Sequence, residues 1–192
     1  MTFLIDDPGK KNVVSFESRA PIETVPGTTH DVTGSITFDP EKIIGPVSGE
    51  VVVDLATLTT GIAKRDEHMR GEGYLDVANY PTAVFALEKV VSSDRQKIAD
   101  GETAQLVVAG KFTLRGVTRD IEAPVTLFFK KASPDLAKMG LTGDLASVRT
   151  NFDVKLADHG IQRPQFLFLK LDETIRVSVQ YTADSGRRKT DG

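Results

Sequence analysis

Alternation of apolar and polar side chains recurs along nearly all of the 192 residues of this chain. Successive side chains of a β-strand point to opposite faces, so a period of two predicts a strand with one buried face. The clearest run places Leu106, Val108, Gly110, Phe112 and Leu114 on one face. Similar rows occur in seven other segments, at residues 14–18, 32–38, 51–55, 83–89, 121–129, 148–154 and 175–181. The pattern predicts an all-β protein.

The connections between these segments are too short for the helical crossovers that parallel strands need, so we expect antiparallel pairing. About eight strands is the number at which a closed barrel is filled by side chains or holds one slender ligand. Closure also removes the exposed edges of an open sheet. We predict one closed antiparallel β-barrel over residues 1–183 and a disordered polar tail at 184–192.

One segment departs from the alternation. Residues 61–70 predict a short helix, with Thr59 or Thr60 as its N-cap and Gly71 at its end. Two smaller features complete the pattern. A helical turn is expected within residues 133–140, and Pro81 should stand at the entry of a strand because proline cannot donate to a sheet ladder.

The helix segment carries a cluster of charged side chains. Asp66 and Arg70 are four residues apart and share a face, so we interpret them as an ion pair that holds the helix over one barrel end. The functional alternative is that His68 or Arg65 lines the mouth of the barrel and contacts the head group of a ligand. The sequence alone leaves both interpretations open.

Composition excludes several classes of function. The absence of cysteine excludes disulfides, thiolate catalysis and Cys-based zinc sites. A formal net charge of −3 and a pI near 5.7 do not favour nucleic acid or an anionic membrane surface as a partner. We find neither an apolar run long enough to span a bilayer nor the pattern of a secretory signal. We expect a cytoplasmic protein, or a periplasmic one if the chain is a processed form.

Residues that could support catalysis do not form a recognisable pattern. The three histidines, His30, His68 and His159, have no common metal-ligand spacing. The chain has no Gly-x-Ser-x-Gly nucleophile elbow and no Gly-rich phosphate loop. We interpret Arg115 and Arg119, beside the turn at Gly116, as solvated or paired surface charges. We therefore expect no catalytic residues, no metal, no cofactor and no enzymatic activity.

Two longer motifs resemble the signature of the YceI-like family. The first is RDEHMRGEGYLDVANYPTAVF at residues 65–85, and the second is the hairpin GKFTLRGVTRD at residues 110–120. A weaker match is the opening Phe3-Leu4-Ile5-Asp6, followed by a Val-Ser-Phe strand at residues 14–16. The resemblance implies a lipocalin-like eight-stranded barrel with an elongated apolar tunnel. It also implies binding of a polyisoprenoid, isoprenoid quinone or fatty amide chain without catalysis.

The inward apolar rows are then the candidate ligand-binding surface. The residues are Phe16, Phe38, Val53, Phe85, Leu87, Val108, Phe112, Val125 and Phe152, with His68 at the mouth. Small residues on the same faces indicate room along the axis; they are Gly34, Gly49, Gly110, Ala83 and Ala123. Periodicity alone leaves other functions open: a ligand-free, stress-related interaction module with a packed core, or an enzyme acting on a quinone or lipid. A homodimer also stays open.

Overall fold

The computed structural model describes residues 1–19, 24–162, 165–166, 169–170 and 172–186. Its strands are β1 (Thr2–Ile5), β2 (Val13–Arg19), β3 (Thr24–Thr29), β4 (Val32–Thr37), β5 (Gly45–Pro46), β6 (Ser48–Asp54), β7 (Thr82–Ser93), β8 (Thr103–Leu114), β9 (Val117–Lys130), β10 (Leu145–Lys155), β11 (Gln165–Phe166), β12 (Leu169–Lys170) and β13 (Thr174–Asp184). The helices are α1 (Ala63–Arg70) and α2 (Pro134–Lys138), and η1 (Leu156–His159) is a 3₁₀ helix.

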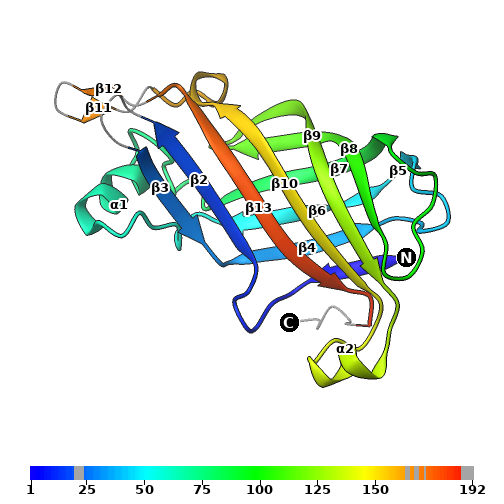
Figure 1. Cartoon of the computed structure of the whole chain (residues 1–192). Coiled ribbons are helices and arrows are strands. Elements are labelled where there is room, and N and C mark those ends of the chain that lie inside the picture. Colours follow the sequence, from blue (N-terminus) through cyan, green and yellow to red (C-terminus); the bar gives the residue numbers. More distant parts are fainter. Residues whose placement is uncertain (20–23, 163–164, 167–168, 171, 187–192) are drawn as a thin grey trace.

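The predicted barrel is confirmed. Neighbouring strands follow the order β1-β4-β6-β7-β8-β9-β10-β13, and β13 returns to β1 through the pair Leu4↔Asp184. Within the described ranges this circuit has eight strands, and every pairing is antiparallel. The free edge of β13 beside this closing pair is occupied by β2, which in turn pairs with β3. Helix α1 lies at one end of the barrel and the N-terminus at the other (Figure 1).

Three strands of this sheet fall outside the predicted segments: β1, β3 and the two-residue β5, which pairs with β7. Strand β1 has four residues, and its alternation, with Phe3 and Ile5 buried, is too brief to be distinctive. Strand β3 contains Pro26 and Gly27, two residues that weaken a strand prediction. Its pairing partner is β2 alone among the named strands, and an edge position of this kind tolerates proline. Periodicity therefore did not predict β1, the strand that closes the barrel against β13.

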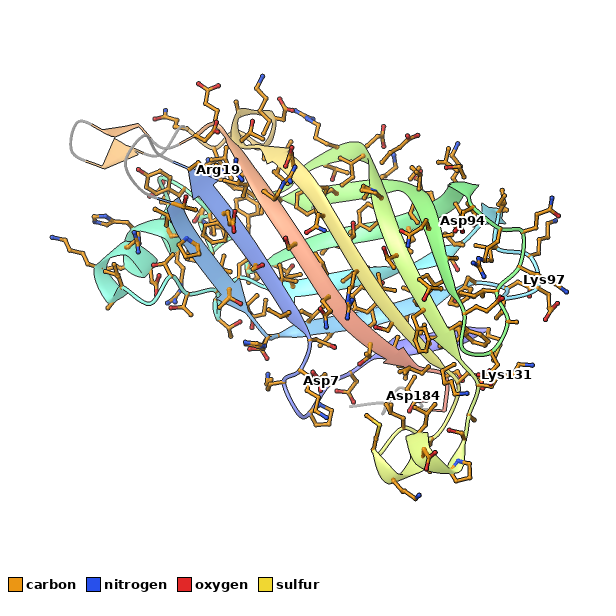
Figure 2. The ribbon with its side chains drawn as sticks, viewed as in Figure 1. Asp7, Arg19, Asp94, Lys97, Lys131 and Asp184 are labelled. Atoms are coloured by element: carbon orange, nitrogen blue, oxygen red, sulfur yellow. The ribbon has the colours of Figure 1, made fainter. Side chains whose placement is uncertain are left out.

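The alternation separates an apolar interior from a charged exterior. The buried residues of the central cluster come from most strands of the circuit and include Ile36, Val51, Leu106 and Val148. Charged side chains such as Arg19, Asp94, Lys97 and Lys131 lie on the periphery (Figure 2). Pro81 directly precedes the first residue of β7, as predicted. No helix in the described part of the chain is long and apolar enough to cross a bilayer.

The helical predictions hold in position but differ in capping. Helix α2 begins after Ser133, whose side chain accepts a hydrogen bond from the N–H of Leu136. Helix α1 occupies the predicted segment, but its N-cap is Ile62, which makes no side-chain cap. The prediction that Thr59 or Thr60 caps this helix is wrong, because both hydroxyls donate to the Asp66 carboxylate instead.

The C-terminal strand extends beyond the predicted end of the domain. Asp184, which we assigned to the tail, is the last residue of β13 and is 2% exposed. Its carboxylate accepts hydrogen bonds from the backbone N–H groups of Thr142, Gly143 and Gly186. Asp184 therefore belongs to the barrel, because it ties β13 to the segment before β10. Ser185 and Gly186 of the predicted tail form a turn in which the Ser185 N–H donates to the Asp144 carbonyl, and residues 187–192 lie outside the described residues.

Candidate functional site

The barrel encloses a cavity of about 380 Å³ along its axis. A single water molecule needs roughly 10–15 Å³ by a comparable measure, so the space accommodates a much larger molecule. On β13 the cavity is lined by Ile175, Val177, Val179 and Tyr181. Since a strand rises about 3.4 Å per residue, these four positions extend over about 20 Å. The cavity is long and narrow, a shape that suits an extended chain.

All ten predicted site residues line this cavity: Phe16, Phe38, Val53, Phe85, Leu87, Val108, Phe112, Val125, Phe152 and His68. Six of them, Phe16, Val53, Phe85, Leu87, Val125 and Phe152, are only partly buried although they point inward. An inward apolar side chain in a packed core is enclosed on all sides, whereas one beside an open lumen keeps accessible surface. The interior is therefore hollow, which periodicity alone could not decide.

Three aromatic rings close the end of the cavity near the N-terminus. Phe3 stacks on Phe38 with ring centroids 4.8 Å apart, and Phe129 meets Phe3 edge to face at 6.4 Å. Phe38 lines the cavity, while Phe3 and Phe129 lie behind it and are 0% and 1% exposed. We call these three residues the aromatic floor. Stacked and edge-to-face pairs of this kind stabilise a core beyond the burial of their area.

Glycines in the wall provide room for phenylalanine rings. Phe16 pairs with Gly27, and a Cβ on Gly27 would stand 2.5 Å from Cζ of Phe16. A Cβ on Gly110 would likewise stand 2.8 Å from Cζ of Phe85. These rings occupy the space above a glycine on a neighbouring strand, which leaves the lumen free. Gly110 itself is not part of the described cavity lining, and a Cβ there would also overlap the Ala86 carbonyl oxygen, so the prediction that this glycine leaves room along the axis is wrong.

Two other glycines do not serve the cavity as predicted. Gly34 and Gly49 have φ angles of +132° and +121°, and a Cβ on either would overlap the backbone of the paired strand. Neither residue belongs to the described cavity lining. Their role is to let β4 and β6 approach closely at a strained position. Ala83 and Ala123, by contrast, line the cavity and are 7% and 3% exposed.

Helix α1 and the loop after it form the other end of the cavity. Ile62, Arg65, His68 and Met69 contribute to the lining there, together with Tyr74 of the loop. Ile62 is 53% exposed and His68 is exposed, so this end borders solvent. We refer to this end as the mouth. Arg65 carries the only formal charge in the described lining.

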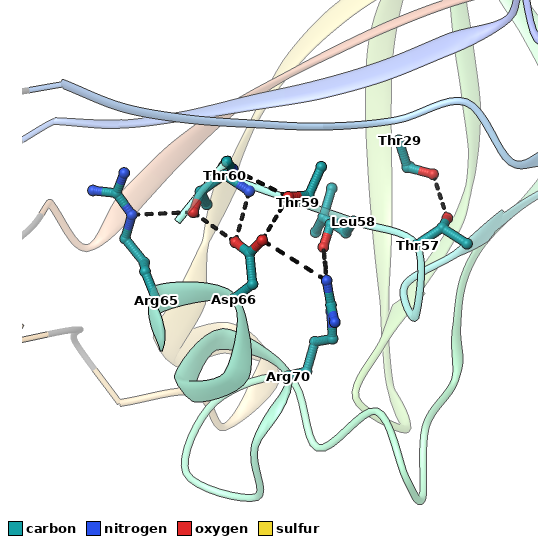
Figure 3. Close-up of polar contacts among 9 residues, drawn as sticks. Thr29, Thr57, Leu58, Thr59, Thr60, Arg65, Asp66 and Arg70 are labelled. Atoms are coloured by element: carbon teal, nitrogen blue, oxygen red, sulfur yellow. Dashed lines mark hydrogen bonds and ion pairs between the residues drawn. The ribbon is translucent and has the colours of Figure 1, made fainter. Parts of the chain in front are cut away.

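Asp66 holds the mouth helix in place (Figure 3). Its carboxylate accepts hydrogen bonds from Thr59 Oγ1 at 2.5 Å, Thr60 N at 2.7 Å and Thr60 Oγ1 at 2.6 Å. Arg70 lies 3.9 Å from this carboxylate and donates to the Leu58 carbonyl at 2.9 Å. Burial by itself raises the pKa of Asp66, but the hydrogen bonds from Thr59 and Thr60 and the charge of Arg70 outweigh it, so the pKa is lowered. The predicted ion pair is present as part of this larger network.

The hairpin arginine is bound more firmly than predicted. Arg115 and Gly116 form a two-residue turn in which both φ angles are positive, at 49° and 72°. The Arg115 guanidinium donates to the carbonyl of Gly160 at 2.6 Å and to that of Glu72 at 2.7 Å. It therefore connects the β8–β9 turn to two segments beside the mouth.

The histidines are dispersed, as the sequence indicated. The Nδ1 atom of His159 lies 3.0 Å from the Val117 carbonyl, and its ring meets Phe112 edge to face at 5.4 Å. The Nδ1 atom of His30 lies 2.8 Å from the Asn12 carbonyl. No cluster of His, Cys, Asp or Glu suited to a metal ion occurs among the residues that the structure describes.

Two cavity residues were overlooked as site candidates. Tyr181 and Thr150 belong to inward rows of otherwise apolar residues, on β13 and β10. Their hydroxyl groups were the available signal, because a polar atom in an apolar row must find a partner inside the barrel.

Known proteins match most of the length of this chain in sequence and in fold. Residues 6–183 match the YceI-like domain. A UPF0312 protein of Pseudomonas putida is 33% identical over 178 residues, which cover 91% of this chain and 84% of that protein. A UPF0312 protein of Yersinia pestis is 35% identical over 135 residues, or 70% of this chain. That match spans 62% of the length of the Yersinia protein.

Solved structures share the fold at low sequence identity. BcnA of Burkholderia cenocepacia superposes with a TM-score of 0.68 at 19% identity, covering 90% of this chain and 96% of that one. A domain from Saccharophagus degradans, described as a polyisoprenoid binding domain implicated in plant cell wall breakdown, gives a TM-score of 0.69 at 16% identity. The superposition covers 95% of this chain and 97% of that domain.

Proposed function

The chain belongs to the YceI-like family, and we propose that it binds a long apolar molecule inside the barrel and carries or sequesters it without catalysis. The candidate ligands are a polyisoprenoid, an isoprenoid quinone or a fatty amide. The observation that carries this proposal is the hollow, elongated lumen, in which inward apolar side chains remain partly accessible. The Saccharophagus domain of the same fold is described as polyisoprenoid binding, which supports the same ligand class.

The energetics of such binding are favourable. A chain that loses about 400 Å² of apolar surface to the lumen gains roughly 10 kcal/mol before the costs of association. The lining contributes no formal charge below the mouth, so the apolar part of the ligand meets apolar walls. Arg65 and His68 at the mouth are the groups nearest to solvent.

The direct test is to identify what the barrel retains. The protein is purified without detergent and extracted with organic solvent, and the extract is analysed by mass spectrometry. We expect a long-chain apolar molecule at near-stoichiometric amount. Protein stripped of this molecule is then titrated with squalene and with decylubiquinone, and we expect both to bind. An empty extract together with no binding of either probe would overturn the proposal.

A further inference from the structure

Two hydroxyl-bearing residues of the cavity lining, Tyr181 and Thr150, lie next to the aromatic floor. Tyr181 pairs with Val148, and Thr150 pairs with the neighbouring Val179, so the two hydroxyl residues are diagonal neighbours on the inner face. Phe129 pairs with Ala146, two residues before Val148, so the floor lies one inward position away. The two residues therefore stand near the closed end of the cavity, with Val177 and Ile175 between them and the mouth on β13.

Neither hydroxyl has a partner among the described residues. Thr150 Oγ1 is buried without a hydrogen bond. Tyr181 is 4% exposed, and none of the hydrogen bonds within the described ranges involves its phenol group. Two other hydroxyls of the lining are satisfied, since Thr60 donates to Asp66 and Thr37 bonds to Thr2, whereas Ser18, nearer the mouth, also lacks a partner. Leaving a polar group unpaired in apolar surroundings costs about 1–3 kcal/mol, so retaining two together requires an explanation.

Water is a poor partner at this position. A buried water molecule is held by two to four polar groups, typically about three hydrogen bonds. Here the two hydroxyls would supply two of these bonds, and the neighbouring inward residues Val148, Val179 and Leu127 offer no third. A ligand atom that accepts hydrogen bonds and is carried in on an apolar body satisfies both hydroxyls without importing water.

We propose that Tyr181 and Thr150 form an internal polar site that binds a carbonyl or ether oxygen of the apolar ligand. This inference rests on the proposed function and narrows it to chains that carry such an acceptor. It also assigns an orientation: the polar group lies at the closed end beside the aromatic floor, and the apolar chain extends toward α1. A hydrocarbon without an acceptor fills the lumen but leaves both hydroxyls unpaired.

The protonation of Tyr181 agrees with a donor role. Burial raises the pKa of its phenol group, so the hydroxyl keeps its proton throughout the physiological range. A phenol that stays neutral offers one O–H donor, and a carbonyl oxygen accepts it. The threonine hydroxyl can rotate to donate to the same atom.

The test uses volume-preserving variants that remove one hydroxyl each, Tyr181→Phe and Thr150→Val. The matched control is Ser18→Ala, which removes a buried cavity hydroxyl on β2 that also lacks a partner. Ser18 lies next to Glu17, which pairs with Arg176, so it stands near the mouth end of β13. Binding of decylubiquinone, which has two carbonyl groups, is compared with binding of squalene, which has no acceptor.

We expect Tyr181→Phe to weaken decylubiquinone binding by about tenfold, or roughly 1.4 kcal/mol, and to leave squalene binding unchanged. Thr150→Val should act in the same direction and Ser18→Ala should not. The carbonyl stretching frequency of bound decylubiquinone should rise in Tyr181→Phe, because a hydrogen bond to the carbonyl is lost. The melting temperatures of the ligand-free variants should not fall below that of the wild type, which verifies that the fold is kept.

The outcomes separate this inference from the proposed function. If the wild type binds both probes and the ratio of their affinities is the same in Tyr181→Phe, the internal polar site is wrong and the carrier function stands. If Ser18→Ala alone reduces that ratio, the polar group lies near the mouth and the orientation is wrong. If neither probe binds the wild type, the proposed function itself fails.

Discussion

The ring of Phe16 packs over Gly27 on the paired strand, in the space that any larger residue at position 27 would occupy. The ring is one of those that line the cavity while remaining only partly buried. The absence of a side chain at Gly27 therefore determines how far this ring projects into the lumen. The wall of the cavity depends on a glycine as much as on a phenylalanine.

Replacement of Gly27 by alanine should narrow the lumen. The new methyl group displaces the Phe16 ring toward the cavity, and we expect weaker ligand binding with a stability cost near the lower end of the 1–3 kcal/mol that overpacking costs. Gly73→Ala is the matched control, because a Cβ there meets nothing within 4 Å. Ligand titration and chemical denaturation of both variants check this, and unchanged binding in Gly27→Ala would refute it.

Filling the lumen should abolish binding without unfolding the barrel. Ala123 lines the cavity, so Ala123→Phe has open space to enter. Ala146 is 0% exposed and lies behind the floor opposite Phe129, so Ala146→Phe must strain the core by about 1–3 kcal/mol. We expect the first variant to lose its ligand at nearly wild-type stability and the second to melt several degrees lower. If Ala123→Phe is as unstable as Ala146→Phe, the interior is a packed core.

The Asp66 network should make stability depend on acid pH. The folded-state pKa of Asp66 is lowered below its ordinary value of 3.8. The stabilisation of the fold by the ionised carboxylate is therefore present above that value and is lost as pH falls through the lowered pKa. Asp66→Asn removes the charge at nearly constant volume, and we expect it to cost about 1–3 kcal/mol near neutral pH.

The difference in unfolding free energy between Asp66→Asn and wild type should then shrink as the pH is lowered below 3.8. Glu67→Gln, at an exposed position of the same helix, is the control and should show no such trend. Denaturant unfolding at a series of pH values measures both. If the difference in unfolding free energy stays constant at every pH below 3.8, the lowered pKa of Asp66 is contradicted.

Arg115 should stabilise the region beside the mouth. Its two hydrogen bonds join the β8–β9 turn to Gly160 and Glu72, and Arg115→Ala removes both. We expect the free energy of unfolding to fall by about 1–2 kcal/mol. This is less than two fully buried charged hydrogen bonds would contribute, because the Arg115 side chain is partly exposed. Arg119→Ala is the control, since Arg119 is exposed and donates only to the adjacent Thr118 carbonyl. Hydrogen exchange of residues 71–79 should accelerate in the first variant alone.

The inward rows could be read from the sequence because each depends on neighbours two residues apart. Every predicted site residue, from Phe16 on β2 to Phe152 on β10, lines the cavity for this reason. The position of α1 and the entry of β7 after Pro81 followed from equally local rules. The YceI-like motifs around Arg65 and Gly110 suggested the proposed ligand class, which periodicity cannot supply.

Contacts between distant segments needed the tertiary structure. The barrel closes where Leu4 pairs with Asp184, and the alternation within the four-residue strand β1 is too short to predict this pairing. Thr59 and Thr60 donate to Asp66 rather than capping α1, and this depends on how the loop folds over the helix. A row of alternating apolar residues reads the same whether its side chains meet across the axis or border a lumen. Only the closed barrel itself, with Phe16 and Phe85 packed over glycines around a cavity, decided that it is hollow.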